Sequence, residues 1–184
     1  MKRRSSMEIS HHTWLKSSVG RELSEGEARE LFMISKRERY VRGERLFSEG
    51  EEATSLYLLA EGEADVVQRR ADGSEHVLAR HPAGAIVGEM SLLTREARSA
   101  SALIASAEAT ILRVTARDLD DLLAREPAVA YKVMFALARV LATRLRAVNH
   151  RLTDMSERTA NANPHEQIEE FAAFKKKLFT DWTF

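Results

Sequence analysis

Residues 55–69 read SLYLLAEGEADVVQR and carry the clearest strand pattern in the 184-residue chain. Two runs rich in aliphatic residues, 55–60 and 64–69, stand on either side of Gly62. Short apolar runs that are separated by turn residues are typical of β-strands. Five further runs have the same character: 39–41, 45–47, 75–80, 99–105 and 109–114. Short strands with turn residues about every 8–12 positions predict a β-sandwich or a β-roll.

The connections between these strands show two local features. Ala71-Asp72-Gly73-Ser74 predicts a hairpin turn, because glycine adopts positive φ without strain. Residues 88–94 do not alternate and predict a single helical turn inside the β-region. The glycines that punctuate the region are Gly43, Gly50, Gly62, Gly73, Gly84 and Gly88.

Helices are predicted on both sides of the strands. Ser24 and Glu27 have the spacing of a capping box, which predicts a helix of about three turns after residue 24. Thr115 is placed to cap a helix over 117–123, and Pro127 suits the first turn of a long second helix.

The long helix has a heptad seam. We expect its first half to pack on the roll through Val129, Val133 and Leu137. The second half is expected to pair with another copy of the chain, because a seam of this period is typical of a coiled coil. The seam consists of Met134, Ala138, Leu141, Leu145, Val148, Leu152 and Met155.

Composition excludes several classes of protein. The chain has no cysteine, which excludes disulfides, iron–sulfur clusters and cysteine nucleophiles. The charges of its 28 basic and 28 acidic residues cancel, so the chain has no net positive charge that would attract nucleic acid. No apolar run approaches the ~20 residues of a membrane span, and the basic N-terminus lacks the apolar stretch of a signal peptide. We therefore expect a soluble cytoplasmic protein.

Ligand chemistry concentrates in two short runs, Val87-Gly88-Glu89-Met90-Ser91-Leu92-Leu93 and Arg98-Ser99-Ala100. A short helix entered through glycine presents free backbone N–H groups that favour an anion. Arg98 adds a planar fork of donors suited to a phosphate, and Ser99 adds a hydroxyl. A phosphate would repel the carboxylate of Glu89, for which a sugar hydroxyl is the natural donor. A phosphate beside a ribose hydroxyl describes a ribonucleotide.

These two runs resemble the phosphate-binding cassette of cyclic nucleotide-binding domains. Such domains occur in catabolite-activator-like regulators, protein kinase A regulatory subunits and cyclic nucleotide-gated channels. The resemblance covers roughly residues 24–150. It implies an α+β fold: a β-roll (double-stranded β-helix, jelly-roll-like) with an N-terminal helix, a short helix in the cassette and a long C-terminal helix. Ala97 stands where many members have proline, and Ala85 where an aspartate is common.

The resemblance implies that Glu89 holds the ribose 2′-hydroxyl, while Arg98 and Ser99 hold the cyclic phosphate. On the long helix, Arg144 is a candidate to stack on the purine, with a solvated position as the alternative. The nucleotide is expected to be cAMP, with cGMP left open. The predicted ligand-binding residues are Gly88, Glu89, Met90, Ser91, Arg98, Ser99, Ala100 and Arg144.

The function predicted from this reasoning is a non-enzymatic cyclic nucleotide sensor that changes conformation on binding and regulates a protein partner. No metal, nucleic acid or membrane is expected to bind, and the long helix is expected to form a homodimer. The alternatives are a ligand-free dimerisation or scaffold module of the same fold, in which Glu89 and Arg98 pair internally, and a transcription-regulator-like protein without its helix-turn-helix.

A metal-dependent cupin enzyme is disfavoured, because His76 and His81 lie five apart on one predicted strand and face opposite sides. The pair His11-His12 is interpreted as part of a solvated terminus, with no third ligand near it in sequence. The expected division is an N-terminal extension at 1–23, a nucleotide-binding domain at 24–158 and an amphipathic C-terminal tail at 159–184.

Overall fold

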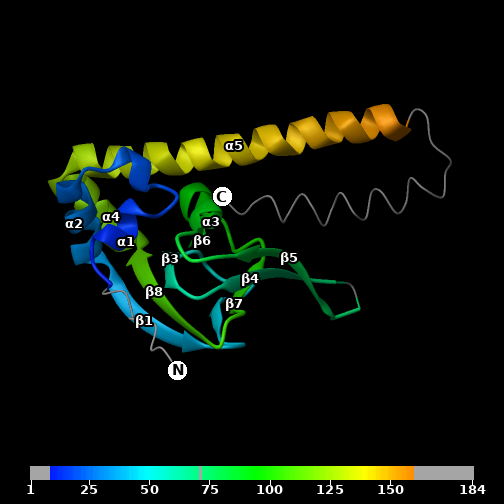
Figure 1. Ribbon diagram of the computed structural model, residues 1–184, viewed down its shortest axis with the longest axis horizontal. Helices are drawn as coiled ribbons and strands as arrows, with labels where there is room; N and C mark the ends of the chain where they lie inside the picture. The colour runs from blue at the N-terminus through cyan, green and yellow to red at the C-terminus, as the bar shows by residue number, and fades with distance from the viewer. Residues whose placement is uncertain (1–8, 71, 160–184) are drawn as a thin grey trace, which may run out of the picture.

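The computed structural model describes residues 9–70 and 72–159 of the chain (Figure 1). The helices are α1 (His12–Leu15), the 3-10 helix η1 (Gly20–Glu22), α2 (Glu25–Ile34), α3 (Glu89–Thr94), α4 (Ala116–Arg125) and α5 (Pro127–Thr159). The strands are β1 (Lys36–Val41), β2 (Arg45–Phe47), β3 (Ser55–Glu61), β4 (Ala64–Arg69), β5 (Glu75–His81), β6 (Ile86–Val87), β7 (Ser101–Ile104) and β8 (Glu108–Thr115).

The strands form two antiparallel sheets of four strands each. One sheet has the order β1-β8-β3-β6 and the other has the order β2-β7-β4-β5. Consecutive strands β3 and β4 therefore belong to different sheets, as expected for a roll and not for a meander. The predicted α+β roll with flanking helices is confirmed. The two-residue strand β6 was not predicted, because it is too short to show an alternating pattern.

Strand β3 has both faces buried, which divides the interior into two hydrophobic cores. Leu56 and Leu58 face the helices, where they pack in one cluster with residues of α2, α4 and α5. Tyr57 and Leu59 point the other way, into the space between the two sheets. Successive side chains of a strand point to opposite faces, so one strand serves both cores.

The local signals for helix and turn formation are confirmed. Ser24 and Glu27 form the predicted capping box at the start of α2, and Thr115 with Asp118 forms another at the start of α4. The hairpin between β4 and β5 turns at Gly73, whose φ is 83°.

The segment before α2 differs from the expected solvated terminus. Trp14 is 1% exposed in the helical core, and its indole Nε1 donates to Ser35 Oγ at 3.1 Å. Ile9, Val19 and Leu23 are buried in the same cluster. These apolar residues are too irregularly spaced to form a helical stripe, so their burial could not be read from periodicity.

Helix α5 has two halves with different surroundings. Val129, Val133 and Leu137 are buried in the helical core, which confirms the prediction for the first half. Figure 1 shows the helix continuing well beyond the other helices along one side of the molecule. Leu145 on this distal part is 60% exposed. The side chains of Val148, Leu152 and Met155, like the C-terminal tail from residue 160, lie outside the described part of the chain.

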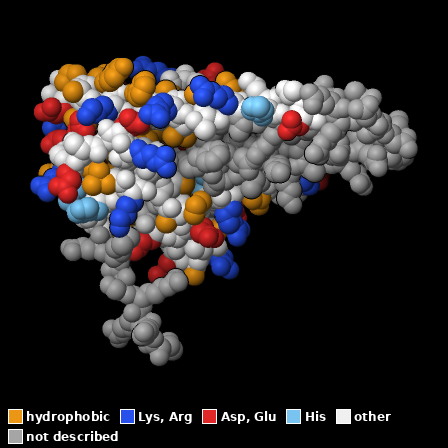
Figure 2. All heavy atoms as spheres, turned by 45° about the horizontal axis from the view of Figure 1, so that its top comes forward, with side chains coloured by type: hydrophobic (Ala, Val, Ile, Leu, Met, Phe, Trp, Pro, Cys, Tyr) orange, Lys and Arg blue, Asp and Glu red, His pale blue; other side chains and the backbone are white. Residues whose placement is uncertain are grey.

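Figure 2 turns the face of the molecule that carries α5 toward the viewer. Hydrophobic side chains are scattered among basic ones on this face. Exposed apolar residues of this helix are Tyr131, Met134, Phe135 and Leu145. Within residues 9–70 and 72–159, no helix is long and apolar enough to cross a membrane.

Candidate functional site

The site begins where β6 turns into α3. Gly88 joins them with φ at 81°, a left-handed conformation that favours glycine. A Cβ atom at this position would lie 2.7 Å from Nη1 of Arg98 and 3.2 Å from the Phe47 ring. Glycine is therefore needed here both for its backbone conformation and for the space next to Arg98.

The backbone of Arg98 is fixed by the loop that follows β2. Its N–H donates to Glu51 O at 2.8 Å, and its carbonyl accepts from the N–H of Gly50 at 2.8 Å. These two bonds hold the cassette to a segment nearly fifty residues earlier in the chain, so the direction of the Arg98 side chain is set by tertiary structure.

The Arg98 side chain points inward and is 3% exposed. Nη1 donates to Gly88 O at 2.6 Å, Nη2 donates to Ser55 O, and the guanidinium carbon lies 4.2 Å from the centroid of Phe47. Nε is buried without a hydrogen-bond partner among the described residues. A buried guanidinium thus donates to two neutral carbonyls, while its Nε–H group lacks an acceptor among the described residues.

Burial lowers the pKa of Arg98, and the charges of Tyr57, Glu51 and Glu89 act in the opposite direction. An arginine remains protonated in proteins despite such a shift. The site therefore holds a full positive charge in a place with little water, where interaction with an anion is strong.

A cavity of about 310 Å³ lies next to this arginine. That volume is at the lower end of the ~300–1,000 Å³ typical of small-molecule sites. Six of the eight predicted ligand-binding residues line it: Gly88, Glu89, Met90, Ser91, Ser99 and Ala100. Glu89 and Ser91 are buried in its wall. The structure therefore brings the two runs of the motif together around one hollow, which we call the cassette pocket.

The two remaining predicted residues are placed differently. Arg98 lies behind Gly88 and Phe47 and does not line the cassette pocket in this structure. The side chain of Arg144 lies outside the described part of the chain, so its predicted contact with the purine stays a prediction.

Sequence reasoning missed the opposite wall of the cassette pocket. This wall comes mostly from the β4–β5 hairpin, with Gln68 and the buried His81 as its polar members. Strand alternation could have placed Val66 and Gln68 on one face of β4, but not which face meets the cassette. The lining residues that were not predicted are Phe47, Val66, Gln68, Leu78, Ala79, His81, Ile86 and Val87.

A larger groove of about 1060 Å³ lies on the other side of α3. Its apolar floor includes Leu92 and Leu93 of α3, Leu119 and Leu123 of α4, and Met134 of α5. We call this the α3–α4–α5 groove. It connects the cassette helix with the long helix, whereas the polar residues of the motif lie in the smaller pocket.

Among the described residues, one group of three His, Cys, Asp or Glu side chains has metal-ligand spacing: His11, His12 and Glu25. It lies outside the roll. The cupin interpretation, which needs such a group inside the roll, therefore gains no support.

Comparison with known proteins identifies the family of the domain. Residues 37–126 match the family model described as "Cyclic nucleotide-binding domain". The chain therefore contains a domain of this family. Among curated proteins, it is 36% identical to the cyclic AMP receptor protein of Thermus thermophilus over 117 residues, which are 64% of this chain and 52% of that protein. The chain spans about half the length, or less, of the first curated relatives that it matches.

Solved structures show the same fold. A cyclic nucleotide-binding domain from Methylobacillus flagellatus superposes with a TM-score of 0.67 at 28% identity, covering 74% of this chain and 79% of that one. The catabolite activator protein of Thermus thermophilus superposes with a TM-score of 0.66 at 26% identity, covering 89% and 83%.

Proposed function

We propose that this protein binds a cyclic purine nucleotide, with cAMP preferred, in the cassette pocket, and that binding changes its conformation to regulate a protein partner. The observation that carries the proposal is the buried guanidinium of Arg98 beside a pocket lined by Glu89 and Ser99. The similarity to the cyclic AMP receptor protein of Thermus thermophilus supports the choice of cAMP.

Arg98 is the group expected to hold the cyclic phosphate. Its carbonyl acceptors are neutral, and a buried charge is costly unless it is well compensated. A phosphate oxygen would accept from the guanidinium, including from Nε, which has no partner among the described residues. Charge-assisted bonds to phosphate are roughly twice as strong as neutral ones, so the exchange of acceptors is favourable.

Glu89 is the group expected to hold the ribose. Its carboxylate lines the same pocket as Ser99 and would be repelled by a phosphate placed against it. A carboxylate accepts hydrogen bonds, and the 2′-hydroxyl of a ribose donates one. This arrangement predicts discrimination against a 2′-deoxy nucleotide.

We expect the conformational change that follows nucleotide binding to be transmitted through α3 and α5. The α3–α4–α5 groove leaves room for the cassette helix to move against the long helix. The exposed distal part of α5, with Leu145, supports homodimer formation through the seam. In this account the protein catalyses no reaction and acts by contact with an effector.

Calorimetric titration of the full chain with cAMP and cGMP, each beside its 2′-deoxy analogue, tests the ligand. We expect one cAMP to bind per chain, with weaker binding of 2′-deoxy cAMP. If neither nucleotide binds, the alternative of a ligand-free dimerisation or scaffold module replaces this proposal. The internal bonds of Arg98 to Gly88 and Ser55 favour that alternative.

Sedimentation of the full chain tests the dimer separately. We expect the double variant Leu145→Glu, Leu152→Glu to be monomeric while the roll remains folded, because charged residues in the seam prevent the two helices from packing together. A monomeric parent at micromolar concentration would contradict the dimer without affecting the ligand.

A further inference from the structure

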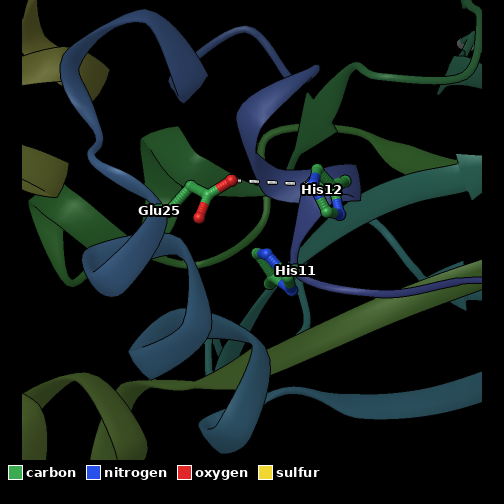
Figure 3. Close-up of side chains that lie close together, drawn as sticks. All are labelled: His11, His12 and Glu25. Atoms are coloured by element: carbon green, nitrogen blue, oxygen red, sulfur yellow. Dashed lines mark ion pairs between the residues drawn. The ribbon is translucent and has the colours of Figure 1, made fainter.

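Three potential metal ligands come together where α1 meets the start of α2 (Figure 3). His11 is the N-cap residue of α1, His12 is its first residue, and Glu25 is the first residue of α2. One ligand atom from each of the three lies within 4.8 Å of the others. Figure 3 shows the carboxylate of Glu25 directed toward the two imidazole rings, which lie 4.2 Å apart between centroids.

The contacts inside this group are weak. His12 Nε2 lies 3.9 Å from the carboxylate of Glu25, which is longer than a hydrogen bond. His11 Nε2 is buried without a hydrogen-bond partner among the described residues. A buried ring nitrogen with no partner is one that a ligand can satisfy.

Two neighbouring side chains contact members of this cluster. Arg29 lies 3.7 Å from Glu25, and Ser10 Oγ lies 3.3 Å from His12 Nδ1. The side chain of Arg29 is 63% exposed, so it can turn away from the carboxylate. The contact of Ser10 leaves Nε2 of His12 available and fixes the ring, as the hydrogen-bond partners of metal-binding histidines do.

We propose that His11, His12 and Glu25 form a binding site for a divalent transition-metal ion, with Zn²⁺ as the ion that the donor set fits best. Two imidazoles and a carboxylate are an established set of protein ligands for Zn²⁺, with water at a fourth position. Zn–N distances near 2.0–2.1 Å place tetrahedral ligands about 3.4 Å apart. The ligand atoms here lie within 4.8 Å of one another, so their separations must shorten by at most about 1.4 Å to complete the site.

The position of the site gives it a structural effect. Bound Zn²⁺ would link α1, which delivers Trp14 to the helical core, to the first turn of α2. Helix α2 in turn contacts α5 through the ion pair of Glu27 and Lys132, at 2.7 Å. The metal would therefore stabilise the folded chain, independently of any nucleotide.

The test is titration of the untagged full chain with Zn²⁺ by calorimetry, together with thermal denaturation. We expect one ion to bind per chain and the unfolding midpoint to rise by about 3–6 °C at a tenfold excess over Kd. Glu25→Gln and His12→Ala each remove an exposed ligand, and each should weaken binding by at least about tenfold. Glu25→Gln leaves the capping box intact, because Glu27 supplies its carboxylate.

His150→Ala is the matched control, since it removes an exposed histidine from the distal part of α5. This variant should bind Zn²⁺ like the parent. The proposal is wrong if the parent does not bind at about 100 μM Zn²⁺, or if Glu25→Gln and His12→Ala bind as tightly as the parent while remaining folded by circular dichroism. Neither result depends on cyclic nucleotide binding.

Discussion

Two arginines of the roll illustrate two uses of one side chain. Arg80 on β5 makes a bidentate pair with Asp65 on β4, with bonds of 2.7 and 2.8 Å, and its side chain is 59% exposed. Arg98 is 3% exposed and donates to two neutral carbonyls. The guanidinium of Arg80 therefore faces water, although the carboxylate of Asp65 is buried, and water screens the pair in part. A buried cation without full compensation is costly, and such groups gather at binding sites.

The largest effect is expected from Arg98→Leu. Removing the guanidinium leaves the phosphate charge unpaired in a shielded site, which should cost about 2–5 kcal/mol of cAMP binding. Arg98→Lys keeps the charge but not the planar fork, and should fall between the parent and Arg98→Leu. Calorimetry measures both. Parent-like affinity in a folded Arg98→Leu protein would show that the cassette is not the phosphate site.

Gly88→Ala should combine backbone strain with displacement of Arg98. The added Cβ meets Nη1 of Arg98 at 2.7 Å, and the residue keeps a φ of 81°. We expect about 1–3 kcal/mol of destabilisation, measured by urea unfolding, together with weaker cAMP binding.

Gly73→Ala separates the two contributions to that effect. Gly73 has a φ of 83° but nothing within 4 Å of the added Cβ. This variant should show the cost of positive φ alone, with unchanged affinity. Equal losses of affinity in the two variants would contradict the role of the Gly88–Arg98 contact.

Glu89→Ala should cost about 1–3 kcal/mol of cAMP binding, the usual range for an unsatisfied hydrogen-bond partner. Because the lost partner is the 2′-hydroxyl, the variant should bind cAMP and 2′-deoxy cAMP equally. Retained discrimination would place the ribose elsewhere in the pocket. The comparison requires titrations of both ligands with both proteins.

The smallest effect is expected from Arg80→Gln. It breaks the bidentate pair of the exposed Arg80 with the buried Asp65 on the same sheet. Nucleotide affinity should equal that of the parent, while the urea midpoint should fall, because the buried carboxylate of Asp65 loses its cationic partner. A loss of affinity comparable to that of Arg98→Leu would mean that burial does not distinguish the two arginines.

Part of the site is local in sequence and part is not. Glu89, Ser91 and Ser99 could be predicted because they lie close together in the sequence as well as in the folded structure. Gln68 and His81 could not, because the β4–β5 hairpin meets the cassette only after the sheets have paired.

The inward direction of the Arg98 side chain could not be predicted from the sequence either. It depends on Ser55 and Phe47, which lie more than forty residues earlier in the chain. Elements with local signals were predicted well. The capping boxes at Ser24 and Thr115 and the buried stripe of α5 at Val129, Val133 and Leu137 are examples.

The most direct test of the central claim is the NMR resonance of the Arg98 Nε–H group, assigned by its loss in Arg98→Lys. We predict that cAMP shifts this resonance and slows the exchange of the Nε proton with water. The reason is that the phosphate supplies a hydrogen-bond acceptor for Nε, which has none among the described residues. A resonance that stays unchanged while cAMP saturates the protein would contradict the assignment of Arg98 as the phosphate ligand.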